Sequence, residues 1–225
     1  MNNFSTIMQY SYPLSYSLIL ATDERGGIGM CNDLPWKRVG YSNSADMTWF
    51  KEKTKGKIII MGYNTWVSLG RKPLPGRTNI VITKNNIDDL KNSIKIYKET
   101  DPTGNSKFTK LMAFESPQQA IDAIKNGVGD FHSGGEVMVI GGAKIYEAFM
   151  EVTSRIYLTT MEGHFEADTF VHLDLDKWDL IYRDNTKSLN PKFEIWDCTV
   201  EAAKRNDSDV MKINYEHLPA EGWVK

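Results

Sequence analysis

The sequence predicts an α/β fold with a central, mostly parallel sheet, an antiparallel strand at its C-terminal edge and helices on its flanks. Short apolar runs typical of buried strands alternate with segments of helical pattern, which is the order found in parallel α/β sheets. A late run, residues 192–198, alternates polar and apolar residues as antiparallel strands do. The 225 residues are 41% hydrophobic, which is enough apolar material for one domain with extensions.

Six apolar runs are too short for typical helices and fit buried strands. With the late run, the expected strands are residues 16–21, 57–61, 79–83, 111–114, 137–140, 155–160 and 192–198.

Helices are expected between these strands, at residues 46–55 and 142–150 and at a segment that begins with Ser116. Ser116 is followed by Pro117 and Gln119, which is a helix-capping pattern. Residues 1–14, 98–110 and 201–225 are expected to be irregular. The predicted division is an N-terminal extension (1–15), one domain (16–198) and a C-terminal tail (199–225).

Charge and cysteine content argue against several classes of protein. The net charge of -2 creates no field that attracts nucleic acid or an anionic membrane. Cys31 and Cys198 are too few for a disulfide framework, so a reducing cytoplasm is expected. No basic residue precedes Arg25, which disfavours a signal peptide, and no apolar run is long enough to cross a membrane. The four histidines lack zinc-ligand spacing, so no metal is expected.

Two junctions between strand and helix are candidates for binding phosphate. Gly62 and the pair Gly141–Gly142 each follow a predicted strand and open a helix, whose first N–H groups are free for an anion. Each junction alone also fits an ordinary tight turn, but both would lie at the carboxyl edge of one sheet and so favour a dinucleotide. Lys84 follows the strand that ends at Thr83 and favours a 2′-phosphate, although most single lysines are ordinary surface residues.

Two charged residues are candidates for binding substrate. Asp46 falls in the first turn of a helix and shares a face with Phe50, so it suits a cationic or amidine-like ligand or simply the positive end of the helix. Arg77 follows the turn Leu74-Pro-Gly76 and suits a carboxylate, although alone it also fits a surface cation.

Several short motifs, taken in order, resemble the dihydrofolate reductase family. Each is weak alone, but the ordered set is specific and spans residues 16 to about 198. The motifs are Ile28–Trp36 (IGMCNDLPW), Asp46–Lys51, Ile60–Trp66, Leu74–Arg77, Val139–Tyr146, Tyr157–Thr159 and Ala167–Phe170.

The resemblance implies NADPH-dependent reduction of 7,8-dihydrofolate to tetrahydrofolate, with a hydride passing to pterin C6 and a proton to N5. Asp46, with Thr159, would bind the pterin N3 and 2-amino groups, and the proton would reach N5 from water. Trp36 would hold an ordered water, and Leu34 would lie at the tip of a mobile loop that closes over the nicotinamide.

The resemblance also implies two sets of binding residues, in which Arg77 would grip the α-carboxylate of the glutamyl tail and a cis peptide would join Gly141 to Gly142. The substrate set is Ile19, Leu20, Ala21, Met47, Phe50, Lys51, Leu69, Leu74, Arg77, Ile140 and Tyr146. The cofactor set is Ala21, Ile28, Gly29, Asn32, Gly62, Tyr63, Asn64, Thr65, Ile82, Thr83, Lys84, Ile140, Gly141, Gly142, Ala143, Lys144, Ile145, Tyr146 and Thr169.

The chain departs from the family pattern in three places. Tyr63 stands where the family commonly has Arg or Lys, so preference for NADPH over NADH would depend more on Lys84. Residues 37–45 form a longer connection that would border the substrate mouth and alter access of antifolates. The tail after Cys198 has no clear counterpart and is too short for the thymidylate synthase domain that is fused to some relatives.

Two rival functions are weaker. A riboflavin-pathway reductase of the same architecture acts on a substrate without a pterin edge or a glutamyl carboxylate, which leaves Asp46, Trp36 and Arg77 without a role. A folate- or nucleotide-binding structural protein would not need Asp46, Thr159 and both glycine junctions, although these do not exclude a second role. A monomer acting on dihydrofolate is expected, with no nucleic-acid or membrane partner.

Overall fold

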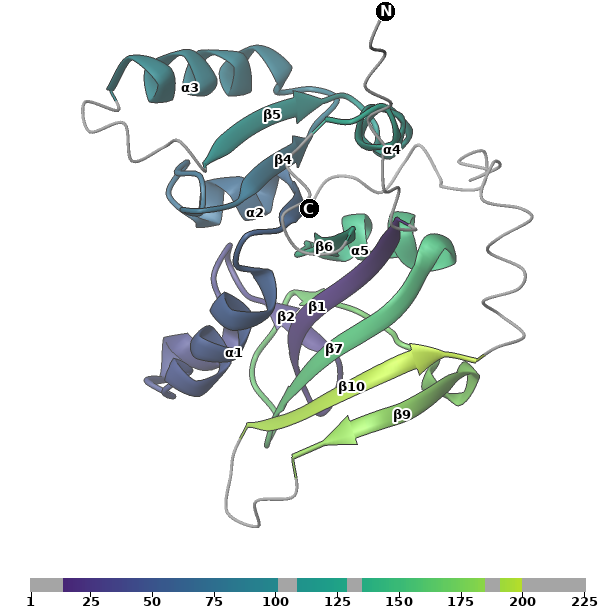
Figure 1. Ribbon diagram of the computed structural model, residues 1–225. Coiled ribbons are helices and arrows are strands. Elements are labelled where there is room, and N and C mark those ends of the chain that lie inside the picture. The colour runs from purple at the N-terminus through teal and green to yellow at the C-terminus, as the bar shows by residue number, and fades with distance from the viewer. Residues whose placement is uncertain (1–13, 101–108, 129–134, 185–190, 200–225) are drawn as a thin grey trace, which may run out of the picture.

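The computed structural model describes residues 14–100, 109–128, 135–184 and 191–199 (Figure 1). The chain forms an eight-stranded sheet of order β5-β4-β3-β6-β1-β7-β10-β9. Its strands are β1 (Ser15–Asp23), β3 (Ile58–Gly62), β4 (Thr78–Ile82), β5 (Lys110–Phe114), β6 (Glu136–Val139), β7 (Thr153–Met161), β9 (Trp178–Arg183) and β10 (Lys192–Cys198). A separate two-stranded sheet pairs β2 (Gly27–Gly29) with β8 (Thr169–Phe170).

The predicted fold class is confirmed. Neighbouring strands from β5 to β7 run parallel, and β10 pairs antiparallel with β7. All seven predicted strands are present, but residues 192–198 are not the edge of the sheet, because β9 pairs on their outer side. That strand was not predicted, since most of its side chains are exposed and it lacks a buried apolar run.

In the described part of the chain, five α-helices connect or flank these strands: α1 (Ser44–Thr54), α2 (Tyr63–Ser68), α3 (Ile87–Thr100), α4 (Pro117–Lys125) and α5 (Ala143–Phe149). The same part of the chain also contains the 3-10 helices η1 (Pro35–Val39), η3 (Met150–Val152) and η4 (Leu175–Lys177). The predicted cap of α4 is present, since the Ser116 hydroxyl accepts the N–H of Gln119 at 3.2 Å. The expected loop at 98–110 is partly wrong, because α3 extends to Thr100 and β5 begins at Lys110; residues 101–108 lie outside the described residues. Most of the predicted extension and tail lies outside them too.

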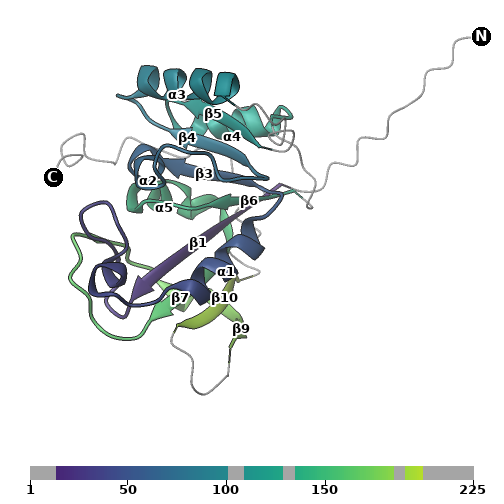
Figure 2. The same cartoon turned by 90° about the vertical axis from the view of Figure 1, so that its left-hand side faces the viewer.

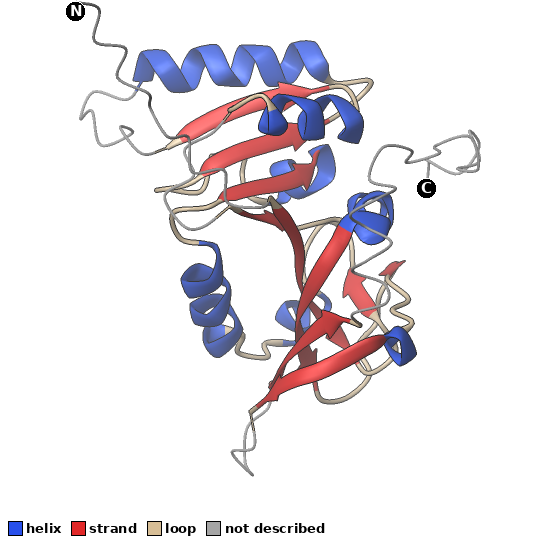
Figure 3. Cartoon of the chain, turned by 45° about the vertical axis from the view of Figure 1, so that its right-hand side comes forward, coloured by secondary structure: helices blue, strands red, loops and turns tan. Residues whose placement is uncertain are grey.

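Alternate residues along each strand enter one of two apolar cores, one on each face of the sheet. Leu18, Leu20 and Ile60 pack with α4 and α5, whereas Ile19 and Ile59 pack with α1, α2 and α3. Figure 3 shows helices on both sides of the strands, and Figure 2 shows α1 beside the part of the sheet that contains β7 and β10. The helix that contains Asp46 therefore lies on the face of the sheet opposite α4 and α5. No helix among the described residues is long and apolar enough to cross a membrane.

Candidate active site

Asp46 is a buried carboxyl group in the first turn of α1, with 8% of its surface exposed. Burial raises the pKa of Asp46, and the Thr159 hydroxyl on β7 acts in the opposite direction. That hydroxyl is itself buried and completes no hydrogen bond of ordinary geometry with the described residues. The pair thus combines a carboxyl shielded from water with a polar group open to a third partner, which is typical of a binding site.

Further predicted residues of β1 and α5 lie close to Asp46 and Thr159. Ala21 on β1 is the register partner of Thr159. The buried Tyr146 of α5 donates to the backbone carbonyl of Ile19 at 2.8 Å. Burial, together with the charge of Asp46, raises the pKa of Tyr146 well above its usual range, so its hydroxyl remains a neutral donor.

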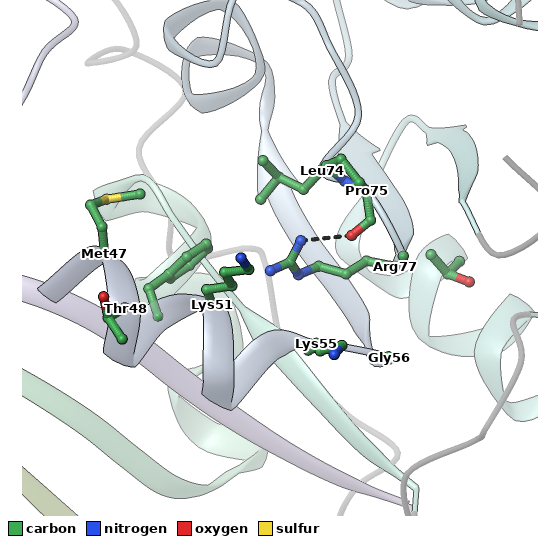
Figure 4. A pocket seen from close by; sticks show the side chains of 11 residues that line it. Met47, Thr48, Lys51, Lys55, Gly56, Leu74, Pro75 and Arg77 are labelled. Atoms are coloured by element: carbon green, nitrogen blue, oxygen red, sulfur yellow. Dashed lines mark hydrogen bonds between the residues drawn. The ribbon is translucent and has the colours of Figure 1, made fainter. Parts of the chain in front are cut away.

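A pocket of about 820 Å³ lies between α1 and the segment that precedes β4 (Figure 4). Five predicted substrate-binding residues line it: Met47, Phe50, Lys51, Leu74 and Arg77. Met47 is 47% exposed, so it can contact a ligand only at the rim.

Arg77 is the charged group that the fold buries in this pocket, with 6% of its surface exposed. Its Nε donates to the Thr54 hydroxyl at 2.9 Å. A terminal nitrogen donates to the carbonyl of Pro75 at 2.8 Å, as Figure 4 shows. Burial lowers the pKa of Arg77, but a guanidinium remains charged in proteins. No described acid forms an ion pair with it. The two bonds fix the guanidinium and leave donors for a carboxylate.

The two glycine junctions lie side by side. The N–H of Gly62 donates to the carbonyl of Gly141 at 2.7 Å, so the starts of α2 and α5 meet at the carboxyl ends of β3 and β6. Neither helix has a side-chain cap. A Cβ on Gly62 would lie 3.0 Å from Ile145, and one on Gly141 would lie 2.9 Å from the ring of Tyr146. At Gly141, whose φ is +104°, only glycine fits this approach, and the peptide bond from Gly141 to Gly142 is cis, as the resemblance implies.

Strand β4 brings Thr83 and Lys84 to the same edge. Ile82, the last residue of β4, is the register partner of Gly62, so both residues follow the strand next to the junctions. Lys84 is exposed, and the hydroxyl of Thr83 accepts the N–H of Asn86 at 3.2 Å.

Tyr63 contacts an acid from the first turn of α3. Its hydroxyl donates to Asp89 at 2.6 Å, and Nε of Arg71 lies 3.9 Å from the same carboxylate oxygen. Tyr63, which stands where the family commonly has a cation, is therefore hydrogen-bonded to a carboxylate.

The predicted loop after β2 is fastened to the segment that contains β8. The carbonyl of Gly29 accepts the N–H of Asp168 at 2.9 Å, and the N–H of Cys31 donates to the Asp168 carboxylate at 2.8 Å. A bridge between Met30 and Asp33 closes the loop tip. Hydrogen bonds to Asp168 thus join the loop to the segment that contains β8.

Trp36 ends this loop and is fully buried. Its indole N–H finds no acceptor among the described residues, which suits the predicted role in holding a water molecule. Its ring meets Phe165 edge-on at 6.1 Å, and Tyr41 from the longer connection meets the same ring at 5.6 Å. At least one residue of the 37–45 segment therefore packs against the loop that follows β7.

The remaining predicted residues divide by position. Near the fastened loop are Ile28, Asn32, Leu34 and Thr169; at the starts of α2 and α5 are Asn64, Thr65, Ala143 and Lys144; and in the core on the α1 face are Leu69 and Ile140. The side chains of Leu20 and Ile82 enter the opposite core, so only their backbone is available to a ligand on the α1 face.

Two acids at the loop were not predicted. Asp168 joins the loop to β8, as described above. Asp23 is fully buried at the end of β1 and accepts backbone N–H groups of Arg25, Gly27 and Phe165 at 2.7–3.0 Å. Burial acts to raise the pKa of Asp23, but these bonds hold it below its usual range. No spacing in the sequence signals either role, because the partners are backbone groups of other segments.

Comparisons with known proteins agree with this arrangement. The family model for dihydrofolate reductase matches residues 15–105 and 102–201. The dihydrofolate reductase of Haemophilus influenzae is 31% identical over 176 residues, which cover 78% of this chain and 90% of that protein. The dihydrofolate reductase of Buchnera aphidicola is 32% identical over 192 residues, which cover 81% and 98%.

A solved structure shares the fold. The dihydrofolate reductase from Enterococcus faecalis, complexed with NADP(H) and RAB-propyl, has a TM-score of 0.60 and 23% sequence identity, and the match covers 82% of this chain and 96% of that one. With the family model and the relatives above 30% identity, the conclusion is direct: the chain belongs to the dihydrofolate reductase family.

Proposed function

We propose that this protein reduces 7,8-dihydrofolate to tetrahydrofolate with NADPH. The observation that carries the proposal is the buried Asp46 carboxyl beside the open Thr159 hydroxyl, on the same face of the sheet as the pocket that holds Arg77. A pterin offers an amidine-like edge to the acid, and its glutamyl tail offers a carboxylate to the arginine.

Asp46 acts by electrostatics and orientation. Its carboxylate accepts hydrogen bonds from pterin N3 and the 2-amino group, and Thr159 joins the same cluster. A negative charge fixed in a dry site stabilises the cationic, N5-protonated substrate and sets the angle of the ring. Water held near Trp36 delivers the proton to N5.

The glycine junctions fit a dinucleotide. The uncapped starts of α2 and α5 offer N–H groups to a pyrophosphate, and Gly62 and Gly141 let the two junctions approach each other closely. Thr83 and Lys84, which follow β4 beside the junctions, would hold the 2′-phosphate. When bound there, NADPH would supply the hydride that adds to C6 of the N5=C6 bond of the pterin. The loop fastened by Asp168 excludes water from that site.

We also propose a cytoplasmic monomer. The two cysteines are free in the structure, as a reducing compartment requires. Size-exclusion chromatography with light scattering tests the monomer, and a mass of about 26 kDa is expected from the 25.6 kDa chain.

The direct test is loss of absorbance at 340 nm with purified protein, NADPH and dihydrofolate. Parallel cuvettes contain NADH in place of NADPH, or the pyrimidine substrate of the riboflavin-pathway reductase in place of dihydrofolate. Oxidation of NADPH that requires dihydrofolate is expected. Oxidation with the pyrimidine alone, or with neither substrate in folded protein, would contradict the proposal.

A further inference from the structure

The hydrogen bond between Tyr63 and Asp89 lies at the edge of the sheet that carries the proposed cofactor site. Tyr63 directly follows Gly62, whose register partner is Ile82 at the end of β4. Lys84 follows the same strand, and Asp89 lies in the first turn of the helix α3 that comes next in the chain. An acid and a cation are therefore both held beside the glycine junctions.

The start of α3 is fixed against the core, so the place of Asp89 is well defined. The hydroxyl of Thr83 accepts the N–H of Asn86 at 3.2 Å, and the carbonyl of Asn86 accepts the N–H of Leu90 at 3.1 Å. Leu90 is fully buried in the core cluster against which Tyr63 packs. Asp89 precedes Leu90 and is thus kept within reach of the Tyr63 hydroxyl.

The hydrogen bond decides what the phenol of Tyr63 can offer to a ligand. A phenol has one proton, and Tyr63 donates it to the Asp89 carboxylate at 2.6 Å. The phenol oxygen can then only accept a hydrogen bond from a further partner. A ribose 2′-hydroxyl can donate such a bond, whereas an ionised 2′-phosphate offers only acceptors. The bonded pair therefore suits a 2′-hydroxyl better than a 2′-phosphate.

The charges at this edge act in opposite directions. Lys84 is exposed and forms no ion pair with an acid in the described part of the chain. Arg71 is directed to Asp89, since its Nε lies 3.9 Å from the carboxylate oxygen that Tyr63 also contacts. At this end of a dinucleotide site a cation favours a 2′-phosphate and an acid favours a 2′-hydroxyl. Asp89 therefore works against Lys84.

We propose that Asp89 is a specificity-determining residue that narrows the preference for NADPH over NADH. This inference rests on the proposed function. Asp89 repels the 2′-phosphate of NADPH, and its bond to Tyr63 leaves an acceptor for the 2′-hydroxyl of NADH. A unit charge about 8 Å from a phosphate with two negative charges changes the affinity for that phosphate by about threefold to tenfold in surroundings as polar as water.

The test measures the Kd of NADPH and of NADH by quenching of tryptophan fluorescence, without substrate, in the parent protein and in Asp89→Asn. The variant should bind NADPH about threefold to tenfold more tightly at low salt and NADH with nearly unchanged affinity. The gain for NADPH should shrink as salt screens the charge. The ratio of kcat/KM for the two cofactors, with dihydrofolate, should shift in the same direction.

Asp88→Asn is the matched control. It removes the same charge from the same turn of α3, but Asp88 is paired with Lys91 at 3.7 Å and forms no printed bond to Tyr63 in the described structure. Its ratio of the two Kd values should stay close to that of the parent. An unchanged ratio in Asp89→Asn, or an equal change in both variants, would overturn the inference.

Tyr63→Phe tests the hydrogen bond separately from the charge. The variant keeps the carboxylate of Asp89 and removes the phenol oxygen, so it should weaken NADH by about twofold to tenfold and leave NADPH nearly unchanged. An equal loss for both cofactors would overturn the role assigned to the phenol. Reduction of dihydrofolate with an unchanged cofactor ratio in Asp89→Asn would reject the inference alone, whereas cofactor binding without any reduction of dihydrofolate would reject the proposed function.

Discussion

Replacement of Asp46 by Asn tests the assignment of the buried acid to the pterin. The substitution keeps the shape of the side chain and removes its charge. At an effective dielectric constant of about 20, a carboxylate about 5 Å from the positive charge of a protonated pterin contributes about 3 kcal/mol. Because 1.36 kcal/mol is a factor of ten, kcat/KM for dihydrofolate should fall by about two orders of magnitude.

The assay is steady-state oxidation of NADPH at 340 nm, paired with a fluorescence titration of NADPH binding. Affinity for NADPH should change by less than about twofold, because no cofactor contact is assigned to Asp46. Asp176→Asn, at an exposed acid of η4, is the control for a change of net charge. A loss of kcat/KM below about tenfold, or an equal loss of NADPH affinity, would refute the reasoning.

Three further predictions follow from the site. Lys84→Ala should weaken NADPH much more than NADH, whereas Lys91→Ala should not, and an unchanged NADPH/NADH ratio in titrations would remove Lys84 from the 2′-phosphate site. Asp168→Ala removes the carboxylate that accepts the N–H of Cys31, and the loss of one hydrogen bond to a charged group should slow hydride transfer by about tenfold in stopped-flow experiments. An unchanged rate would show that hydride transfer does not depend on this hydrogen bond. Asp46→Asn should raise Tm at pH 7, by about 2–4 °C for each kcal/mol gained. The folded-state pKa of Asp46 is raised, so the native carboxylate destabilises the fold above that pKa, and the gain should vanish below the unfolded pKa of about 3.9; a gain independent of pH would contradict this.

The sequence predicts the buried part of the fold well and its surface poorly. Central strands such as β3 and β4 are continuous apolar runs, because both faces of the sheet are covered. The helix α3 was not predicted, although Ile87, Leu90 and Ile94 recur at helical spacing after Asn85 and Asn86, which indicate a turn. Strand β9 is exposed on most of its length, so neither a run nor a regular alternation marks it.

The site shows the same division. Motifs place Asp46, Arg77 and the glycine junctions because those residues act within a local pattern. The contact of Tyr63 with Asp89 and the backbone bonds of Asp168 join segments that are distant in the sequence. Such pairs depend on the register of β2 with β8 and on the packing of α2 beside α3, which a single sequence does not specify.

The most direct test of the central claim is transfer of the label from NADPH that carries deuterium at the reactive C4 position. The tetrahydrofolate formed from dihydrofolate is analysed by mass spectrometry and proton NMR. One deuterium at C6 of the pterin is predicted, with none elsewhere on the ring. Consumption of NADPH without deuterium at C6, or deuterium at another ring position, would contradict the proposed reaction.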